Sequence, residues 1–208
     1  MRILGYGEDA LTLWALKQHM PKILGKFKDK TSLSECIAFY RPSFGRRGKG
    51  NSIFGEFDAI IASKQSIYLI ESKWDNHNKF SNKEFPLEDH QVLRHQIFTW
   101  YLTHWSKKYS GNWQSFRDEN QTYFSFLNKS MAPSGSLLAR NLEYILKKIH
   151  EHCGVPSEAN IKNVFLFFFN SEKSNPPTKI AKDFTLIPIE YNGETEDNFV
   201  TLLSEQNR

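Results

Sequence analysis

The sequence is poor in the features that mark secreted, membrane and zinc-cluster proteins. It has only two cysteines, Cys36 and Cys153, which are too far apart for a CxxC metal knuckle, and a single disulfide would be an unusual staple for a chain of this size. No stretch approaches the roughly 18 consecutive apolar residues of a membrane span. The first residues, MRILGYGEDALTLW, lack the uninterrupted apolar stretch of a signal peptide. We therefore expect an intracellular, cytoplasmic protein that does not enter a membrane.

An excess of one charge is also largely missing. The chain has 27 Lys and Arg against 23 Asp and Glu, a net charge of +4, which is compatible with a nucleic-acid partner and equally with an ordinary protein. What the chain does contain is apolar: 39% of its 208 residues are hydrophobic, and 17 are Phe. This composition excludes a disordered chain. The length suffices for one substantial domain and is too short to argue for two.

Hydrophobic periodicity predicts helices and strands in a definite order. Helices are expected from Gly7 to about Pro21 and over Glu88–Lys108, Leu137–His152 and Asn198–Gln206. Strands are expected over Cys36–Tyr40, Ile53–Ala62, Ile67–Lys73, Asn163–Phe169 and Thr185–Tyr191, the last at a sheet edge because it contains Pro188. Residues 109–135 carry no clear pattern. This order predicts an α/β or α+β protein in which helices cover a sheet.

Two of the expected strands, before and after a turn at residues 63–66, carry charges within a strongly apolar segment. A symmetric turn at this place puts Asp58 directly opposite Glu71. The same register puts Glu56 directly opposite Lys73. Because opposed side chains share one face of a sheet and alternate residues repeat it, all four charges are expected on one side of the hairpin.

Burial of such charges needs a physical reason. An ion-pair network is one, in which Lys73 neutralises one of the acids, although each buried ion costs several kcal/mol. Directly opposed carboxylates repel each other unless a positive charge lies between them. A hard divalent cation such as Mg²⁺ answers this need, because it binds one or two carboxylates together with waters and phosphate oxygens. The pattern therefore favours a metal site over an ion-pair network.

The hairpin resembles the signature of the PD-(D/E)xK nuclease superfamily, in which an Asp is followed by an apolar strand and an acid-x-Lys motif. The matching residues are Gly55-Glu56-Phe57-Asp58 and Tyr68-Leu69-Ile70-Glu71-Ser72-Lys73, with Phe57 in place of Pro. The expected element order is similar to the αβββαβ core of this restriction-endonuclease-like fold, an α/β fold whose mixed central sheet is flanked by helices. The resemblance covers about Gly7 to Asn170, and only the hairpin is specific. It implies a single nuclease domain over residues 1–208 with a helical insertion at roughly 109–160.

The resemblance further implies a Mg²⁺-dependent endonuclease that hydrolyses DNA phosphodiester bonds in restriction, repair or defence, with Mn²⁺ as an expected substitute. Asp58, Glu71 and the backbone carbonyl of Ser72 would hold the metal. Lys73 would orient or help deprotonate the attacking water and stabilise developing negative charge. Glu8, on the first helix, matches a position that adds an outer metal or water contact in many family members. The alternative role of Glu8 is to complement the helix dipole.

Further residues are candidates for contacts around this site. Some branches of the superfamily place a Gln on the helix after the hairpin; Gln96 resembles that position best, Gln91 is the second choice, and a surface Gln is the alternative. The loop residues Arg46, Arg47 and Lys49 are candidates for binding the DNA backbone, or else only for solubility. DNA is the expected partner, and RNA is not excluded as a substrate. A homodimer is expected if both strands are cut, because this usually takes two active sites.

Other interpretations of the sequence are weaker. The run Gly45–Gly50 is not a phosphate-binding P-loop, because two residues instead of four separate its first glycines and no Ser or Thr follows its Lys, so no nucleotide cofactor is expected. His150 and His152 point apart on a helix, and no second cluster completes a zinc site. The main alternative function is a catalytically inactive nucleic-acid-binding module of the same fold. A structural protein with a simple ion-pair cluster is the third hypothesis.

Overall fold

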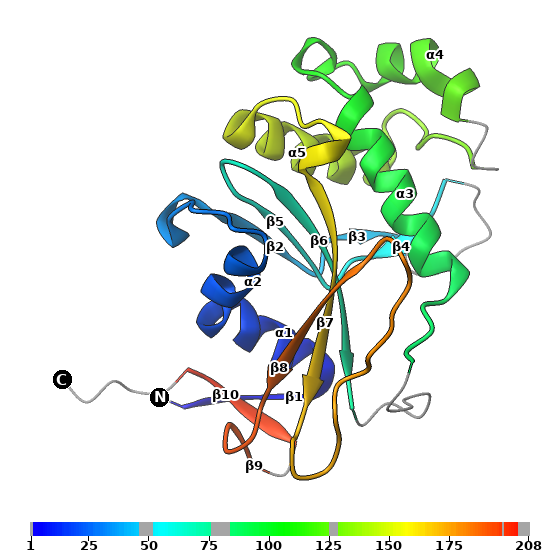
Figure 1. Ribbon diagram of the computed structural model, residues 1–208. Coiled ribbons are helices and arrows are strands. Elements are labelled where there is room, and N and C mark those ends of the chain that lie inside the picture. Colours follow the sequence, from blue (N-terminus) through cyan, green and yellow to red (C-terminus); the bar gives the residue numbers. More distant parts are fainter. Residues whose placement is uncertain (1, 46–51, 76–83, 125–128, 197, 204–208) are drawn as a thin grey trace.

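The computed structural model describes residues 2–45, 52–75, 84–124, 129–196 and 198–203 of the chain. It shows a mixed α/β protein built around a five-stranded sheet (Figure 1). In spatial order, the strands of this sheet are β2 (Ile37–Tyr40), β5 (Ala59–Ala62), β6 (Ile67–Trp74), β7 (Ile161–Phe169) and β8 (Thr185–Glu190). The strand β5 is antiparallel to both of its neighbours, β2 and β6, whereas β7 and β8 run parallel to β6.

All five strands lie where the sequence pattern predicts strands. The β5–β6 hairpin has the predicted register, with Ala62 opposite Ile67, and the backbone N–H of Ser63 closes the turn by donating to the carbonyl of Ser66 at 2.9 Å. The apolar strand β7 lies between β6 and β8 and is buried over most of its length. The strand β8, which contains Pro188, is at the edge of the sheet, as predicted for a strand that lacks one N–H donor.

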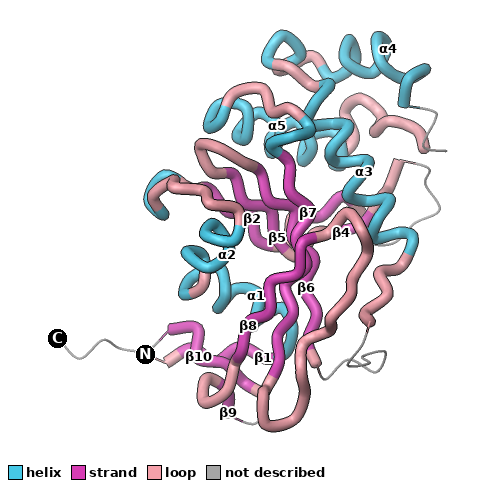
Figure 2. The backbone as a smooth tube through the Cα atoms, viewed as in Figure 1, coloured by secondary structure: helices cyan, strands magenta, loops and turns pink. Residues whose placement is uncertain are grey.

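Helices cover both faces of the sheet (Figure 1, Figure 2). The helices α1 (Gly7–Gln18) and α2 (Met20–Lys26) pack on one face, and α3 (Asp89–His104) and α5 (Leu137–Cys153) pack on the other. Three of these helices, α1, α3 and α5, match the predicted ones. Pro21 does not end the helical region, because it lies in the first turn of α2, where no N–H donor is needed.

Side chains of β6 alternate between the two apolar layers. Ile67 and Leu69 pack on the side of α3 and α5, and Tyr68 and Ile70 pack on the side of α1 and α2. All four are fully buried. Because side chains alternate along a strand, the next residue, Glu71, is directed toward α3.

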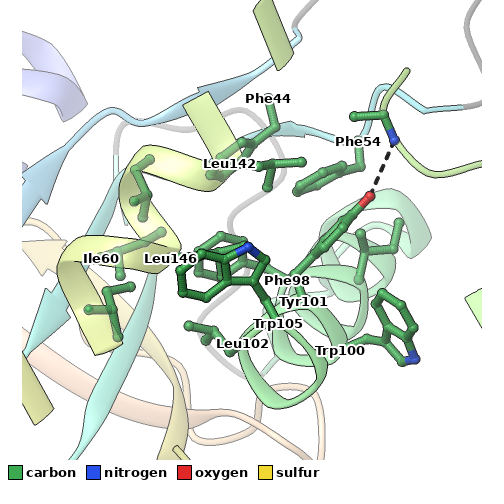
Figure 3. Packing of buried hydrophobic residues seen from close by; sticks show 14 of the residues in the cluster. Phe44, Phe54, Ile60, Phe98, Trp100, Tyr101, Leu102, Trp105, Leu142 and Leu146 are labelled. Carbon is green, nitrogen blue, oxygen red and sulfur yellow. Dashed lines mark hydrogen bonds between the residues drawn. The ribbon is translucent and has the colours of Figure 1, made fainter. Parts of the chain in front are cut away.

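The layer between the sheet and the helices α3 and α5 is rich in aromatic rings (Figure 3). Phe98, Tyr101 and Trp105 of α3 are buried there against α5 residues such as Leu146. The Tyr101 hydroxyl accepts a hydrogen bond of 3.4 Å from the backbone N–H of Ala132, so its polar end has a partner (Figure 3). This close packing holds α3 against the sheet and thereby fixes the residues at its first turns.

The expected strand Ile53–Ala62 is interrupted in the structure. Its first part forms β4 (Gly55–Glu56), which pairs with β3 (Ser43–Phe44) in a separate two-stranded sheet. Gly55 has a φ angle of +109°, a backbone conformation that L side chains rarely adopt. The break between β4 and β5 lies at Phe57 and Asp58, so that only the second half of the segment joins the central sheet.

The final segment is a strand, and the prediction of a helix over Asn198–Gln206 is wrong for its described residues. The strand β10 (Phe199–Leu203) pairs antiparallel with β1 (Ile3–Tyr6) and with β9 (Thr195–Glu196) in a three-stranded sheet. Its partner β1 lies at the opposite end of the sequence, so no local pattern could indicate the pairing. Residues 204–208 of the predicted helix lie outside the described residues.

Residues 109–135, which have no clear sequence pattern, contain the helix α4 (Trp113–Phe124). Together with α5, it lies between α3 and β7 in the chain, where the helical insertion is expected. Over the described ranges of the chain, no helix is both long and apolar enough to cross a membrane.

Candidate functional site

The predicted acids lie at the part of β6 that has no partner in β5, here called the open flank of β6. The ladder between β5 and β6 ends at the pair Ala59–Ile70, while β6 continues beside β7 as far as Trp74. Asp58 lies just before β5, and its Oδ2 accepts a hydrogen bond of 2.6 Å from the backbone N–H of Ser72. This carboxylate therefore satisfies a backbone donor that the β5 ladder no longer pairs.

Glu71 is buried, with 3% of its surface exposed, and two side chains of α3 hold its carboxylate. Gln91 donates a hydrogen bond from Nε2 to Glu71 Oε1, and Nη2 of Arg94 lies 3.2 Å from Glu71 Oε2. Gln91 is itself fixed by the capping box of α3, because its Oε1 accepts a hydrogen bond of 2.8 Å from the backbone N–H of Glu88. The start of α3 thereby sets the orientation of the Glu71 carboxylate.

Lys73 contacts three oxygen groups. Its Nζ lies 3.0 Å from Glu8 Oε1 and 3.2 Å from Glu71 Oε1, and it donates a hydrogen bond to the carbonyl of Ser72. Burial lowers the pKa of Lys73, but the carboxylates of Glu71, Glu8 and Asp58 outweigh it and raise the pKa above its ordinary value. Lys73 is therefore a fixed cation among acids.

The site disfavours the ionised form of Asp58. Burial raises the pKa of Asp58 from an ordinary 3.8 to about 7, and the negative charges of Glu71 and Glu8 act in the same direction. The ammonium of Lys73 and the backbone N–H of Ser72 oppose this shift without cancelling it. Near neutral pH this carboxyl is thus divided between neutral and ionised forms, and an added positive charge would favour the ionised form.

Arg94 connects Glu71 to the small sheet of β3 and β4. Its Nη1 donates a hydrogen bond to the backbone carbonyl of Glu56, and its guanidinium carbon lies 5.6 Å from the ring centroid of Phe57. Only 7% of Arg94 is exposed. The sequence analysis misses this residue; its one signal is the i, i+3 spacing from Gln91, which places both side chains on one face of α3.

Glu56 pairs with Arg41 and not with Lys73. Arg41 Nε lies 2.7 Å from Glu56 Oε1, and Nη1 of the same guanidinium contacts Asp9. Arg41 has a φ angle of +50°, in the left-handed region that few non-glycine residues adopt. The prediction that Glu56 lies opposite Lys73 is wrong, because β4 leaves the central sheet and Glu56 lies opposite Ser43.

The structure brings together Asp58, Glu71, Ser72, Lys73 and Glu8, the set that the sequence analysis places in one site. These residues come from the start of α1, the segment before β5 and the second half of β6. Their convergence depends on the hairpin register, which puts Ala59, the first residue of β5, beside Ile70 in the middle of β6.

The helix α3 contributes Gln91 to this group and not Gln96, the first choice from the sequence. Gln96 is exposed and lines a cavity of about 420 Å³ between α3 and the start of β7, whereas Gln91 contacts Glu71. Residues five positions apart lie on different faces of a helix with 3.6 residues per turn, so one helix cannot direct both toward the site. The predicted DNA-backbone contacts Arg46, Arg47 and Lys49 lie outside the described residues.

The oxygen groups of this site fit a hard divalent cation. Asp58, Glu71 and the carbonyl of Ser72 supply two carboxylates and one carbonyl, and Mg²⁺ completes such a set with waters and phosphate oxygens. Oε2 of Glu71 is buried without a hydrogen bond, although Nη2 of Arg94 lies 3.2 Å from it. Oε1 of Glu71 and the Ser72 carbonyl have the Lys73 ammonium as their cationic partner. Within the part of the chain that the structure describes, no three His, Cys, Asp or Glu side chains group closely enough to hold a metal. An ion would therefore depend on the carbonyl and on ligands from water or substrate.

Two carboxylates, an ammonium, a guanidinium and a backbone carbonyl thus meet in one largely buried cluster at the flank of a sheet. Such a cluster can hold a divalent cation beside an anionic substrate and stabilise negative charge that develops on it. Comparisons of the chain with protein-family models, with curated proteins and with solved structures find no match.

Proposed function

We propose that this chain is a Mg²⁺-dependent nuclease of the restriction-endonuclease-like fold that hydrolyses phosphodiester bonds of DNA. The observation that carries this proposal is the cluster of Asp58, Glu71 and Lys73 at the open flank of β6. The fold keeps these charges together although an ionised Asp58 is unfavourable in that place. Titratable groups whose pKa values are strongly shifted by burial and by one another are concentrated at functional sites.

In this proposal, Asp58, Glu71 and the carbonyl of Ser72 hold the metal. When bound, the ion supplies positive charge beside the phosphate and lowers the pKa of a coordinated water. Gln91 and Arg94 keep the Glu71 carboxylate in one orientation, since each contacts a different oxygen of it. Such supporting contacts are required for a metal ligand to stay in place.

Lys73 acts on the substrate in this proposal. Because its pKa is raised by the surrounding acids, Lys73 stays protonated and is suited to donate hydrogen bonds to a phosphate oxygen or to the attacking water. A protonated lysine cannot remove a proton from that water, so stabilisation of negative charge is the role that the contacts support. Glu8, 3.0 Å from Nζ, holds Lys73 in position and is the nearest carboxylate outside the metal set.

The order of elements along the chain supports the proposed fold. The helix α1, the strands β2, β5 and β6, the helix α3 and the strand β7 follow one another in the order αβββαβ, with α2, α4 and α5 as additions. The acids lie at the β5–β6 hairpin, the place that the resemblance implies for metal ligands. DNA is the proposed partner because its phosphates are the natural substrate of such a site.

Two competing explanations predict different behaviour. A catalytically inactive module of the same fold would bind DNA without cutting it. A structural ion-pair network would need neither Mg²⁺ nor DNA, because Lys73 already contacts the carboxylates of Glu71 and Glu8.

A cleavage assay distinguishes these explanations. Supercoiled, linear, single-stranded and four-way-junction DNA, and RNA, are incubated with the protein and Mg²⁺ or Mn²⁺. Cutting should stop in EDTA and in Lys73→Ala, and it should persist in Lys147→Ala, which removes a surface lysine of α5. Cutting by Lys73→Ala would contradict the assigned site. DNA binding without cutting supports the inactive module, and the absence of DNA binding and of Mg²⁺ binding in calorimetry supports the ion-pair network.

A further inference from the structure

The three-stranded sheet of β1, β9 and β10 has one covered face and one exposed apolar face. On the covered face, Val200 and Leu202 pack against the layer that contains α1. On the exposed face, Tyr6 and Phe199 are directly opposite each other, and their ring centroids are 5.3 Å apart. Tyr6 is 63% exposed and Phe199 is 41% exposed. Two aromatic rings are thus presented to solvent from paired positions of a sheet.

This aromatic pair lies beside chain neighbours of the proposed active-site residues Glu8 and Lys73. Tyr6 directly precedes the helix that carries Glu8, and its ring packs edge-on against Trp74, at 6.4 Å between centroids. Trp74 directly follows Lys73 in β6. The Cα atoms of Tyr6 and Glu8 can be at most about 7 Å apart, since two residues span no more. This distance corresponds to about two nucleotide steps of a stacked strand.

We propose that Tyr6, supported by Phe199, forms a stacking surface for an unpaired base next to the phosphodiester bond that is cut. The inference rests on the proposed nuclease function and adds a substrate class to it, namely single-stranded DNA or unpaired ends of DNA. An aromatic ring stacks on any base, so the surface selects for strandedness and not for sequence. Inside a duplex both faces of a base are covered by its neighbours, so only an unpaired or terminal base can use the ring.

A nucleic-acid strand fits this surface better than a second copy of the chain does. The exposed apolar side chains of β1 and β10 are Ile3, Leu4, Tyr6 and Phe199. Side chains of this kind expose roughly 400 Å² in total at these fractions, about half of the ~800 Å² that each partner of a stable dimer buries. A patch of this size is large enough for one or two bases.

The test compares binding of a labelled oligothymidylate and of labelled, covalently closed circular duplex DNA, which has no unpaired or terminal base, by filter binding in EDTA so that nothing is cut. Tyr6→Ala should weaken binding of the single strand on the order of tenfold, because stacking on one ring is lost, and should leave duplex binding nearly unchanged. Tyr6→Phe keeps the ring and should bind like the wild type. Tyr144→Ala is the matched control, because Tyr144 is 60% exposed on α5.

Glu71→Gln, measured alongside, separates this inference from the proposed function. If both hold, Glu71→Gln no longer cleaves DNA in Mg²⁺, and Tyr6→Ala still weakens single-strand binding when it is combined with Glu71→Gln. If the wild type cuts DNA but Tyr6→Ala binds both probes like the wild type, the stacking surface is refuted and the nuclease stands. If no probe is cut but Tyr6→Ala still loses single-strand binding, the nuclease fails and the base-binding surface stands. Sedimentation tests whether the surface binds a second copy. If the wild type is a dimer, Tyr6→Ala is a monomer and single-strand binding shows no selective loss, the surface belongs to a dimer interface and the inference is overturned.

Discussion

Replacement of Asp58 by Asn is expected to stabilise the metal-free protein while it removes activity. Asn has nearly the same size, and its Oδ1 can still accept the hydrogen bond from the backbone N–H of Ser72, which is 2.6 Å long in the wild type. Only the negative charge is lost. Because burial and the acids Glu71 and Glu8 make this charge unfavourable in the fold, its removal favours the folded state wherever Asp58 would be ionised.

The magnitude follows from the pKa of Asp58, which rises from an ordinary 3.8 to about 7 in the fold. A carboxyl with a higher pKa in the fold binds protons more tightly there than in the unfolded chain. Its contribution to stability is therefore fully present below about pH 4 and is lost as the pH rises to about 7. Since one pKa unit corresponds to about 1.4 kcal/mol, a rise of roughly three units makes the loss above neutral pH on the order of 4 kcal/mol.

Urea denaturation in EDTA at several pH values measures this difference. The free energies of unfolding of the wild type and of Asp58→Asn should be similar near pH 4, and the variant should be more stable by the amount above near pH 8. Asp118→Asn is the matched control, because it removes an exposed carboxylate of α4 that accepts a hydrogen bond from Gln114. It should follow the wild type at every pH.

Mg²⁺ should narrow this difference in stability, because the wild type gains more from the ion than the variant does. An ion at about 100 times its Kd stabilises the fold that binds it by about 2.7 kcal/mol, and Asp58→Asn should gain little of this because it lacks one ligand. The reasoning is refuted if the variant is no more stable than the wild type near pH 8 in EDTA. Equal stabilisation of both proteins by Mg²⁺ would refute the assignment of Asp58 as a metal ligand.

Three further predictions concern α3 and the core. Arg94→Met removes one of the two cations that contact the buried Glu71 carboxylate, the other being Lys73, and should lower the free energy of unfolding in urea by about 3 kcal/mol. Arg94→Lys should lose less, and an equal loss would contradict the ion pair. Gln91→Ala should slow cleavage by about 10- to 100-fold in initial-rate assays, because the orientation of Glu71 is then less fixed. Gln96→Ala should cut at the wild-type rate. The reverse result would favour Gln96, the first choice from the sequence. Leu146→Ala should lower the free energy of unfolding, measured by thermal denaturation, by about 2–5 kcal/mol, because the side chain is fully buried in the layer of Figure 3. A decrease below about 1 kcal/mol would contradict that packing.

Local patterns are sufficient where one strong apolar signal continues over a whole element. The run from Asn163 to Phe169 predicts a strand buried on both faces, and it lies in the interior strand β7. Charges within apolar strands are equally visible, because each of them breaks the pattern. Residue type and spacing are therefore enough to select Asp58, Glu71 and Lys73. They are also enough to predict the hairpin register that aligns these residues.

Local patterns fail where the deciding contact comes from a distant part of the chain. Phe199–Leu203 forms a strand because β1, at the other end of the sequence, pairs with it. Glu56 contacts Arg41 because β4 pairs with β3 outside the central sheet. Neither partner can be read from neighbouring residues, since strand pairing and ion pairing depend on position in space.

The sequence by itself determined which charged side chains gather at the site, because residue type and strand alternation suffice to put Asp58, Glu71 and Lys73 on one side of a hairpin. Only the tertiary structure decided which side chains complete the cluster. The capping box of α3 and the packing of that helix on the sheet direct Gln91 and Arg94 to the two oxygens of Glu71. Helical periodicity tells which residues share a face, but the rotation of a helix against a sheet is set by how the whole core packs.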